Sequence, residues 1–326
     1  MRVAVLDDYQ NVALTIADWS PLKGRAEVSV FHDHLSDEDR LIERLRDFDC
    51  ILGMRERTAF PRSLIERLPK LKLLLTTGMN NRSYDMTAAT ERGIMICGTD
   101  GGSMPTAELA WGLILGLARK IPQEDRATRE GAWQTSLGVG MADKTLGLLG
   151  LGKLGSQMAK IGNAFGMKVI AWSQNLTEER CRAVGAAKSA SKDALLGEAD
   201  VVSIHLILSE RTRSLIGQRE FALMKPTAYL VNTSRGPIID EAALIEAVKQ
   251  KRLAGIGIDV YDVEPLPADH PLRHLPGTVI TPHLGYVTEG NYRDYYGKSV
   301  ENIVAFLDGV PRRVINQDIL AAAAKS

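Results

Sequence analysis

The sequence predicts an α/β protein with parallel sheets, and three observations lead to this prediction. Short apolar runs alternate with amphipathic segments along nearly the whole chain, a pattern typical of strands joined by crossover helices. A glycine-rich hexapeptide, 150–155, directly follows one apolar run and opens a helical segment. The 326 residues exceed what one hydrophobic core usually contains, so we expect two domains.

The first block, residues 1–98, alternates strands and helices but has no glycine loop of the phosphate-binding kind. Segments 36–45 and 62–68 have helical periodicity, and Ser36 is placed to cap the first of them. The expected strands are Val3–Leu6, Glu27–Phe31, Cys50–Met54, Leu71–Thr76 and Ile94–Cys97. This block therefore predicts a small parallel sheet of its own.

The second block, residues 99–288, predicts a doubly wound sheet. An apolar helix, 106–117, and an irregular stretch, 131–143, come before its first strand. Six strands are expected: Leu146–Leu149, Val169–Ser173, Val201–Leu206, Ala228–Asn232, Ile256–Val260 and Thr278–Ile280. Helices are expected at 156–165, 191–196, 218–224 and 241–250, followed by a last helix at 289–307.

The hexapeptide Gly150-Leu151-Gly152-Lys153-Leu154-Gly155 has the spacing of a dinucleotide turn. The first glycine makes the tight turn, the second lets the backbone approach a pyrophosphate, and the third lets helix and strand pack closely. The helix N-terminus offers N–H groups and a positive dipole end to the phosphates. The bare pattern also occurs in structural turns, but a strand before it and a helix and second strand after it favour a nucleotide site.

The overall composition is that of a soluble globular protein without a polyanionic or membrane partner. Lys plus Arg and Asp plus Glu both number 40, so no basic excess points to nucleic acid or an anionic membrane. No apolar stretch approaches the roughly 20 residues of a membrane span, and the N-terminal run lacks the features of a signal peptide. Cys50, Cys97 and Cys181 are scattered and odd in number. They predict reduced cysteines in a cytoplasmic protein, with no disulfide framework or metal site.

Four side chains that could carry chemistry follow strands of the second block. They are Arg235, Asp259, Glu264 and His283. Ligands of doubly wound sheets lie beyond the carboxyl ends of the strands. Arginine can hold a carboxylate bidentately, and histidine exchanges protons near neutrality. Each residue alone is more often a loop charge or a locally satisfied side chain, but their shared position beside the glycine turn favours one site.

The sequence indicates a functional role less strongly for the other histidines. His270 and His274 lie in a loop without that placement, and His32 and His34 flank an aspartate with no partner of the metal-binding kind. We therefore interpret these four as structural or solvated. His205 ends a strand and could either touch a cofactor or pack.

With these motifs in view, the chain resembles the D-isomer-specific 2-hydroxyacid dehydrogenases over nearly its full length. The resemblance rests on Gly150–Gly155, Val231–Pro237 with Asp240, Asp259–Pro265 and Pro282–Gly285. It implies a Rossmann nucleotide-binding domain, 99–288, inserted in a smaller flavodoxin-like substrate domain made of 1–98 and 289–326. It also implies a homodimer joined through the nucleotide-binding domains, partly by an arm at 119–143.

The resemblance also implies roles for individual residues. Arg235 would bind the substrate carboxylate and polarise the adjacent carbonyl, His283 would protonate the oxygen as hydride arrives, and Glu264 would pair with His283. Thr77 and Gly78 match a glycine loop that receives the substrate carboxylate. The residues implied at the cofactor are Thr106, Gly150, Gly152, Lys153, Leu154, Gly155, Ser173, His205, Thr233, Asp259 and Gly285.

Two positions depart from the family pattern. Ser173 stands where an acidic residue usually bonds the ribose hydroxyls of NAD and repels a 2′-phosphate. Ser173, Gln174 and Asn175 are neutral, and the nearest downstream cation in sequence is Arg180. We therefore expect NADPH to be accepted, with NAD or NADP as the cofactor. The second departure is His205-Leu206-Ile207 in place of His-x-Pro, which affects the local loop.

The leading hypothesis is hydride transfer between NAD(P)H and a small 2-keto acid such as glyoxylate or hydroxypyruvate. An alternative of another class is an NAD(H)-sensing binding protein of the same fold, similar to the C-terminal binding protein corepressors. Formate dehydrogenase of the same superfamily is disfavoured, because that branch has glutamine where this chain has Glu264. Substrate identity, physiological direction and pathway stay open at this point.

Overall fold

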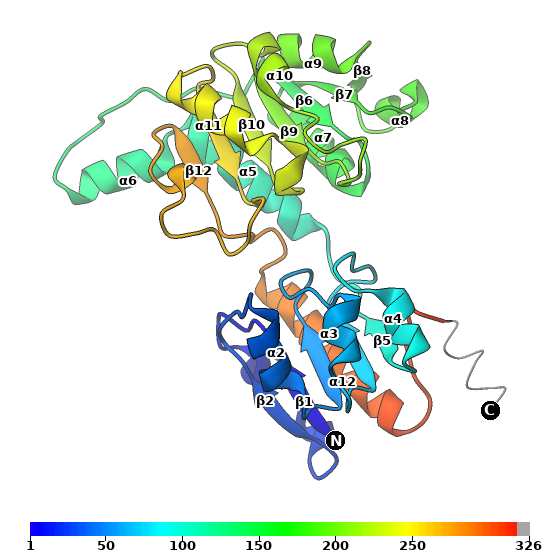
Figure 1. The fold of residues 1–326 in the computed structure, drawn as a ribbon. Coiled ribbons are helices and arrows are strands. Elements are labelled where there is room, and N and C mark those ends of the chain that lie inside the picture. The colour runs from blue at the N-terminus through cyan, green and yellow to red at the C-terminus, as the bar shows by residue number, and fades with distance from the viewer. Residues whose placement is uncertain (318–326) are drawn as a thin grey trace. The chain divides into compact units, whose positions relative to one another are not determined.

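The computed structural model describes residues 1–317. The chain divides into two compact units, each with its own parallel sheet (Figure 1). Unit 1 comprises residues 1–102 and the chain from Thr288 onward, and unit 2 comprises residues 103–287. Unit 1 is thus built from both ends of the chain, whereas unit 2 is one continuous segment.

Unit 1 contains the five strands expected in the first block, all parallel, in the order β2-β1-β3-β4-β5. Their bounds are β1 (Arg2–Val5), β2 (Glu27–Val30), β3 (Cys50–Gly53), β4 (Leu73–Thr76) and β5 (Met95–Gly98). Every residue of β3 and β4 is buried, as in a central parallel strand covered on both faces. The predicted alternation of strands and helices is confirmed for this block.

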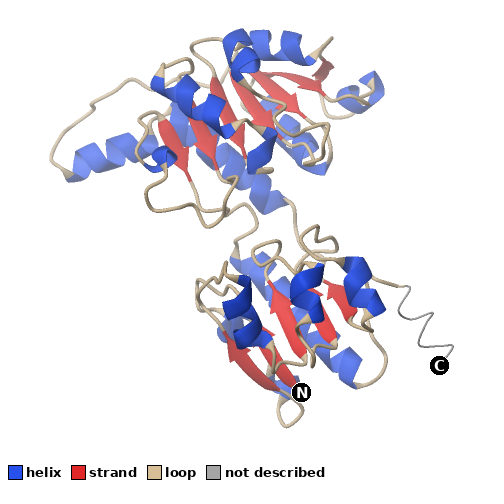
Figure 2. Ribbon diagram, viewed as in Figure 1, coloured by secondary structure: helices blue, strands red, loops and turns tan. Residues whose placement is uncertain are grey.

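Helices cover both faces of this sheet (Figure 2). They are α1 (Ala13–Ile16), the 3-10 turn η1 (Ser20–Leu22), α2 (Glu38–Leu45), α3 (Arg62–Glu66), α4 (Met86–Glu91) and α12 (Glu289–Leu307). Apolar side chains of α2, α3 and α4 share one core with the strands. Helix α1 and η1 pack against α12 instead.

Two details of the first block were predicted wrongly. Ser36 does not cap α2, because the helix begins later and the Asp37 carboxylate accepts from the Arg40 N–H at 2.9 Å. Helices α1 and α4, of four and six residues, were not predicted. The cap of α4 is again an aspartate, Asp85.

The segment after α12 completes unit 1 by joining the edge strand β5. Ile315 N donates to Ile96 O at 2.8 Å, and Ile96 N donates to the Asn316 side chain at the same distance. Within α12, Asn302 Nδ2 donates to Gly98 O at 2.9 Å. The C-terminal segment therefore satisfies backbone groups that β5 would otherwise expose at the edge of its sheet.

Unit 2 contains a seven-stranded parallel sheet in the order β12-β11-β10-β9-β6-β7-β8. The bounds are β6 (Thr145–Leu149), β7 (Lys168–Trp172), β8 (Ala187–Lys188), β9 (Val201–Ile204), β10 (Tyr229–Asn232), β11 (Gly255–Ile258) and β12 (Thr278–Ile280). The six predicted strands are present. The seventh, β8, was missed because its two residues are exposed and carry no strand pattern.

Helices lie on both faces of this sheet, which confirms the doubly wound prediction (Figure 2). They are α5 (Met104–Ala118), α6 (Ile121–Arg129), α7 (Lys153–Ala164), α8 (Glu178–Arg182), α9 (Lys192–Glu198), α10 (Gln218–Leu223) and α11 (Glu241–Lys249), with 3-10 turns η2 (Gly236–Ile238) and η3 (Pro271–Arg273). Helices α5 and α7 share one core with the sheet, and α9, α10 and α11 share the other. Helix α7 starts three residues earlier than predicted, directly after Gly152.

Replacement of a fully buried leucine tests the core of unit 1. Leu74 in β4 is 0% exposed, so Leu74→Ala should lower the free energy of unfolding by about 2–5 kcal/mol through lost burial and a cavity. Leu14 in α1 is 53% exposed, and Leu14→Ala should change stability by about 0.5 kcal/mol or less. Urea unfolding followed by circular dichroism measures both, and equal losses in the two variants would contradict the packing described.

Candidate active site

The glycine turn between β6 and α7 has the backbone geometry that its sequence predicts. Gly150 has a φ of +99°, and a Cβ there would lie 2.5 Å from His205 O. A Cβ on Gly155 would lie 2.1 Å from Gly150 O, which only glycine avoids. A Cβ on Gly152 would meet nothing within 4 Å. The first and third glycines therefore allow close backbone packing, and the second faces open space.

The N-terminus of α7 is suited to bind phosphate. Gly152 is its N-cap and supplies no side-chain oxygen, so the N–H groups of the first turn are not capped by that side chain. Lys153 and Leu154 are the first two residues of the helix, and Lys153 is exposed. Free N–H groups, the helix dipole and open space at Gly152 together fit the pyrophosphate of a dinucleotide.

The sheet order brings the predicted catalytic side chains to one edge of unit 2. Arg235 follows β10, Asp259 and Glu264 follow β11, and His283 follows β12. These three strands are adjacent and parallel, so their carboxyl ends lie together. Residues from three separate stretches of sequence are thus collected beside one another by the strand order.

His283 and Glu264 form a hydrogen-bonded pair. His283 Nδ1 lies 2.6 Å from Glu264 Oε2, and the other carboxylate oxygen accepts from the Tyr261 N–H at 2.9 Å. His283 has a φ of +55°, and its ring meets Tyr286 edge-on with centroids 5.5 Å apart. Glu264 therefore orients the imidazole through Nδ1, and Nε2 is the ring nitrogen that does not face this carboxylate.

Asp259 holds the loop that carries His283. Its side chain is 0% exposed, and its carboxylate accepts from Thr281 Oγ1 at 2.6 Å, Leu284 N at 2.7 Å and Gly285 N at 2.9 Å. Burial raises the pKa of the Asp259 carboxyl above its usual value, and these donors oppose that rise. Thr106 adds a bond from α5, its hydroxyl donating to Gly285 O at 2.9 Å. Asp259 and Thr106 are therefore engaged with the loop.

The backbone before Arg235 is fixed by its neighbours in sequence. Asn232 Nδ2 donates to Arg235 O at 2.9 Å, and Asn232 Oδ1 accepts from Ser234 N at 3.0 Å. Arg235 Nη1 donates to Ser234 O at 2.6 Å. The hydroxyl of Thr233 is buried and has no hydrogen-bond partner among residues 1–317. A buried hydroxyl of this kind fits a site where a bound molecule completes the hydrogen bonding.

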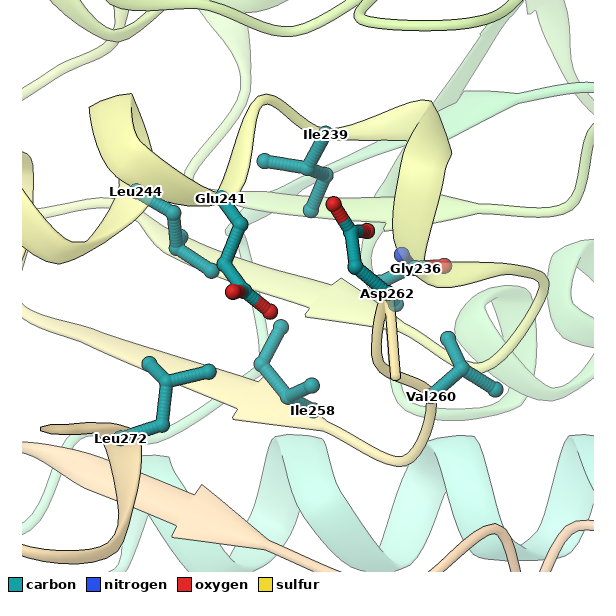
Figure 3. Close-up of a pocket in the computed structure, with 9 residues that line it drawn as sticks. Gly236, Ile239, Glu241, Leu244, Ile258, Val260, Asp262 and Leu272 are labelled. Carbon is teal, nitrogen blue, oxygen red and sulfur yellow. The ribbon is translucent and has the colours of Figure 1, made fainter. Parts of the chain in front are cut away.

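A small pocket lies behind the loops that follow β10 and β11 (Figure 3). It is lined by Asn232, Gly236, Ile239, Glu241, Leu244, Ile258, Val260, Asp262 and Leu272. A Cβ on Gly236 would lie 2.2 Å from the carbonyl carbon of Tyr261, so the two loops can approach only with glycine there. Burial raises the pKa of Asp262 at its rim. The pocket is therefore lined by the two loops near the place where Gly236 lets them approach each other.

His205, at the end of β9, is held as a neutral ring. Its Nε2 lies 2.8 Å from Ser203 Oγ, and within the described part of the chain its buried Nδ1 has no partner. Burial lowers the pKa of His205 to about 4. The backbone carbonyl of His205, and not its ring, is the group that lies against Gly150.

The end of β7 carries a feature that sequence reasoning missed. Ser173 follows β7 and is half-buried, and Gln174 beside it is exposed. Arg211, from the loop after β9, donates through Nη1 to Gln174 Oε1 at 3.2 Å. Nothing local in the sequence joins these two loops, but both follow neighbours of β6 in the sheet.

Thr77 and Gly78 belong to unit 1, at the carboxyl end of β4. Thr77 is buried, and its hydroxyl accepts from Arg55 N at 2.9 Å. Gly78 has a φ of +100°, and its N–H donates to Thr99 Oγ1 at 3.2 Å. Arg55 Nη1 donates to Thr77 O at 3.3 Å, so this arginine lies on the loop although the sequence analysis passed over it. Its position just after β3 was the available signal.

Other chemical groups occupy structural positions. His270 Nε2 lies 3.0 Å from Glu241, and His34 Nδ1 lies 3.0 Å from Asp7. The three cysteines are buried and unbonded to one another, and burial raises the pKa of Cys97 to about 12. Across residues 1–317, no set of three or more His, Cys, Asp or Glu side chains is arranged to hold a metal. In the same range no helix is both long and apolar enough to cross a membrane.

Comparison with known proteins decides the family. The family model described as the NAD binding domain of D-isomer specific 2-hydroxyacid dehydrogenase matches residues 111–285. The chain belongs to this family. Its relatives include a glyoxylate reductase of Thermococcus litoralis, 35% identical over 294 residues, covering 87% of this chain and 88% of the relative. Another, from Aeropyrum pernix, is 38% identical over 268 residues, covering 79% and 80%.

Solved structures agree with this assignment. A phosphoglycerate oxidoreductase of Vibrio cholerae has a TM-score of 0.90 and 35% identity, and the match covers 95% of this chain and 99% of that one. The resemblance recognised in the sequence is therefore confirmed. The chain is an oxidoreductase with a nicotinamide cofactor, and its activity is hydride transfer to and from the 2-position of keto and hydroxy acids.

Removing one acceptor of Asp259 should loosen the loop that carries His283. In Asp259→Asn the amide cannot accept three hydrogen bonds at the former positions, so one buried donor loses its partner. We expect a loss of about 1–3 kcal/mol in the free energy of unfolding and faster hydrogen exchange at Leu284 and Gly285. Asp269→Asn, in an exposed loop, is the matched control. Unchanged exchange at these two amides would contradict the role given to Asp259.

His205 should contribute to the pH dependence of stability. Its pKa falls from 6.5 to about 4 on folding, so between these values the unfolded chain binds more protons than the folded one. Above pH 6.5 the ring is neutral in both states, and His205 takes nothing from the free energy of unfolding. As the pH falls toward 4, the unfolded chain binds a proton at His205 that the folded chain does not, so the free energy of unfolding decreases. Thermal melts of wild type and His205→Gln at pH 7.5 and 5 should therefore show a smaller acid-induced loss in the variant. Parallel losses would contradict the lowered pKa.

Proposed function

We propose that the protein reduces small 2-keto acids of the glyoxylate and hydroxypyruvate class, with Arg235, Glu264 and His283 as its catalytic residues. The observation that carries this proposal is the 2.6 Å bond between His283 Nδ1 and Glu264, formed at the same sheet edge as Arg235. The named relatives act on substrates of this kind, since two of them are glyoxylate reductases. A panel of 2-keto acids, assayed with both reduced cofactors, tests it.

We assign proton transfer to His283. When bound, the reduced nicotinamide supplies hydride to the carbonyl carbon. The oxygen then needs a proton, which the imidazolium of His283 gives through Nε2 and takes back in the oxidative direction. Glu264 accepts from Nδ1–H, so it fixes the ring orientation.

Arg235 has the chemistry to bind the substrate. A guanidinium can hold a carboxylate through two parallel hydrogen bonds and place a further N–H near the adjacent carbonyl oxygen. Its backbone is held by Asn232, so the side chain starts from a fixed point. In unit 1, we propose Thr77 and Gly78 as substrate-binding residues. Their N–H groups donate to Gly53 O at 3.3 Å and to Thr99 Oγ1 at 3.2 Å, and binding of a carboxylate would replace these acceptors.

The remaining proposed cofactor residues line the edge of unit 2. The glycine turn with Lys153 and Leu154 would hold the pyrophosphate, and the buried hydroxyl of Thr233 would meet the nicotinamide side. Asp259, Thr106 and Gly285 are bonded to one another, so they would shape the wall of the site. His205 would support the turn from below, as its packing against Gly150 suggests.

We propose that either NAD or NADP serves, because Ser173 offers no negative charge to repel a 2′-phosphate. We further propose a cytoplasmic homodimer. In the arm, α6 has no buried residues, Trp133 is 79% exposed and Leu137 is 90% exposed. Large apolar side chains this exposed favour burial against a second copy of the chain.

Loss of the proton donor should lower turnover. His283→Ala should reduce kcat for keto-acid reduction by about 10²–10⁴-fold, the usual contribution of a general acid, while NADH affinity stays close to wild type. His274→Ala, in an exposed loop of the same unit, is the control and should keep full activity. Stopped-flow turnover and cofactor fluorescence measure the two effects. A His283→Ala enzyme with wild-type turnover would remove His283 from the mechanism.

Loss of the proposed carboxylate-binding arginine should affect binding and turnover together. In Arg235→Ala a misoriented substrate loses rate as well as affinity, so kcat/KM should fall by about 10³-fold or more. Arg252→Ala is the matched control, because Arg252 bonds Ala222 O ahead of β11 and away from the carboxyl ends of the strands. Near-normal kcat/KM in Arg235→Ala would exclude a carboxylate clamp at this position.

A further inference from the structure

Two loops that are distant in sequence meet beside the glycine turn. One follows β7 and begins with Ser173 and Gln174, and the other follows β9 and contains Arg211. Strands β7 and β9 flank β6, whose carboxyl end carries Gly150. Arg211 Nη1 donates to Gln174 Oε1 at 3.2 Å. A guanidinium is therefore held next to the strand end where the family usually places a carboxylate.

The charge of Arg211 is not neutralised within the structure. Among residues 1–317, its hydrogen bond to Gln174 is to a neutral amide, and it forms no ion pair. Arg219, further along the same segment, is by contrast bonded to both Asp193 and Glu220. Arg211 is also exposed, so it can bind an anion without first breaking a salt bridge.

We propose that Arg211, with Ser173 and Gln174, binds the 2′-phosphate of NADP(H) and so determines cofactor selectivity. This inference rests on the proposed function, since it places a nicotinamide dinucleotide on the glycine turn. Guanidinium groups bind phosphate oxygens bidentately, the Ser173 hydroxyl is a further donor, and the Gln174 amide carries two N–H groups besides its bonded oxygen. NADH lacks the phosphate and gains nothing from these donors.

The sequence alone points to a different cation. Arg180 is the first arginine after Ser173, and it lies in α8 beyond two glutamates of the first turn. Arg211 is much further along the chain, but strand order brings it to Gln174. The pair Arg180 and Arg211 thus provides a matched comparison, because removal of either takes one positive charge from an exposed site of unit 2.

Fluorescence titration of the purified full chain with NADPH and with NADH tests the inference without relying on turnover. Arg211→Ala should weaken NADPH binding by about 10- to 100-fold, the scale of a lost charge-assisted hydrogen bond, and leave NADH binding within about twofold. Arg180→Ala should leave both affinities unchanged. Arg211→Lys should keep part of the NADPH affinity, since the charge remains but the fork geometry is lost. Displacement of NADPH by 2′,5′-ADP should weaken in Arg211→Ala, and displacement by 5′-AMP should not.

Each contrary result has a distinct meaning. Equal weakening of NADPH and NADH in Arg211→Ala would assign the arginine to loop structure and overturn the inference. Unchanged NADPH affinity would overturn it too. Wild type that binds NADH but excludes NADPH would do the same while leaving the proposed keto-acid reduction intact. Wild type that binds neither dinucleotide would overturn the proposed function and the inference together.

Discussion

The buried carboxylate of Asp259 is the interaction on which the edge of unit 2 that carries His283 depends. It leaves the end of β11 and accepts three hydrogen bonds from the segment after β12, namely from Thr281, Leu284 and Gly285. Those bonds fix the backbone on both sides of His283 and permit its left-handed conformation. A buried charge is costly unless it is fully hydrogen-bonded, and here the three donors offset part of that cost. The carboxylate thus joins the segment after β11 to the segment after β12 by hydrogen bonds.

The glycine turn is the second rigid element of this edge. Backbone atoms of Gly150, Gly155 and His205 approach so closely that side chains are excluded at the first two positions. The backbones of the loops after β10 and β11 approach each other in the same way at Gly236. In each case a missing side chain lets two backbones meet. The His283–Glu264 pair and the glycine turn therefore lie on tightly bonded or closely packed parts of the chain, as a preorganised site requires.

The sequence was informative where local patterns carry structure. Alternating apolar runs predicted the parallel sheets, and the position of Arg235, Glu264 and His283 after strands predicted their shared edge. Short or exposed elements were not predicted, because the two residues of β8 or the four of α1 cannot show a period. The cap of α2 was misplaced by one residue because serine and aspartate both cap helices. Arg211 could not be selected from sequence, since its neighbour Gln174 follows another strand, whereas the position of Arg55 just after β3 was a signal that was passed over.

The pairing of the C-terminal segment with β5 has a consequence for how the chain folds during synthesis. Unit 1 needs α12 and the backbone of Ile315 to cover its sheet, and these are the last described parts of the chain to be translated. Unit 2 is continuous and can close its core as soon as it emerges from the ribosome. Residues 1–102 must therefore wait, with an incomplete apolar face, until unit 2 and α12 have been made. The part of unit 1 that precedes unit 2 in the chain is in this way completed only after unit 2.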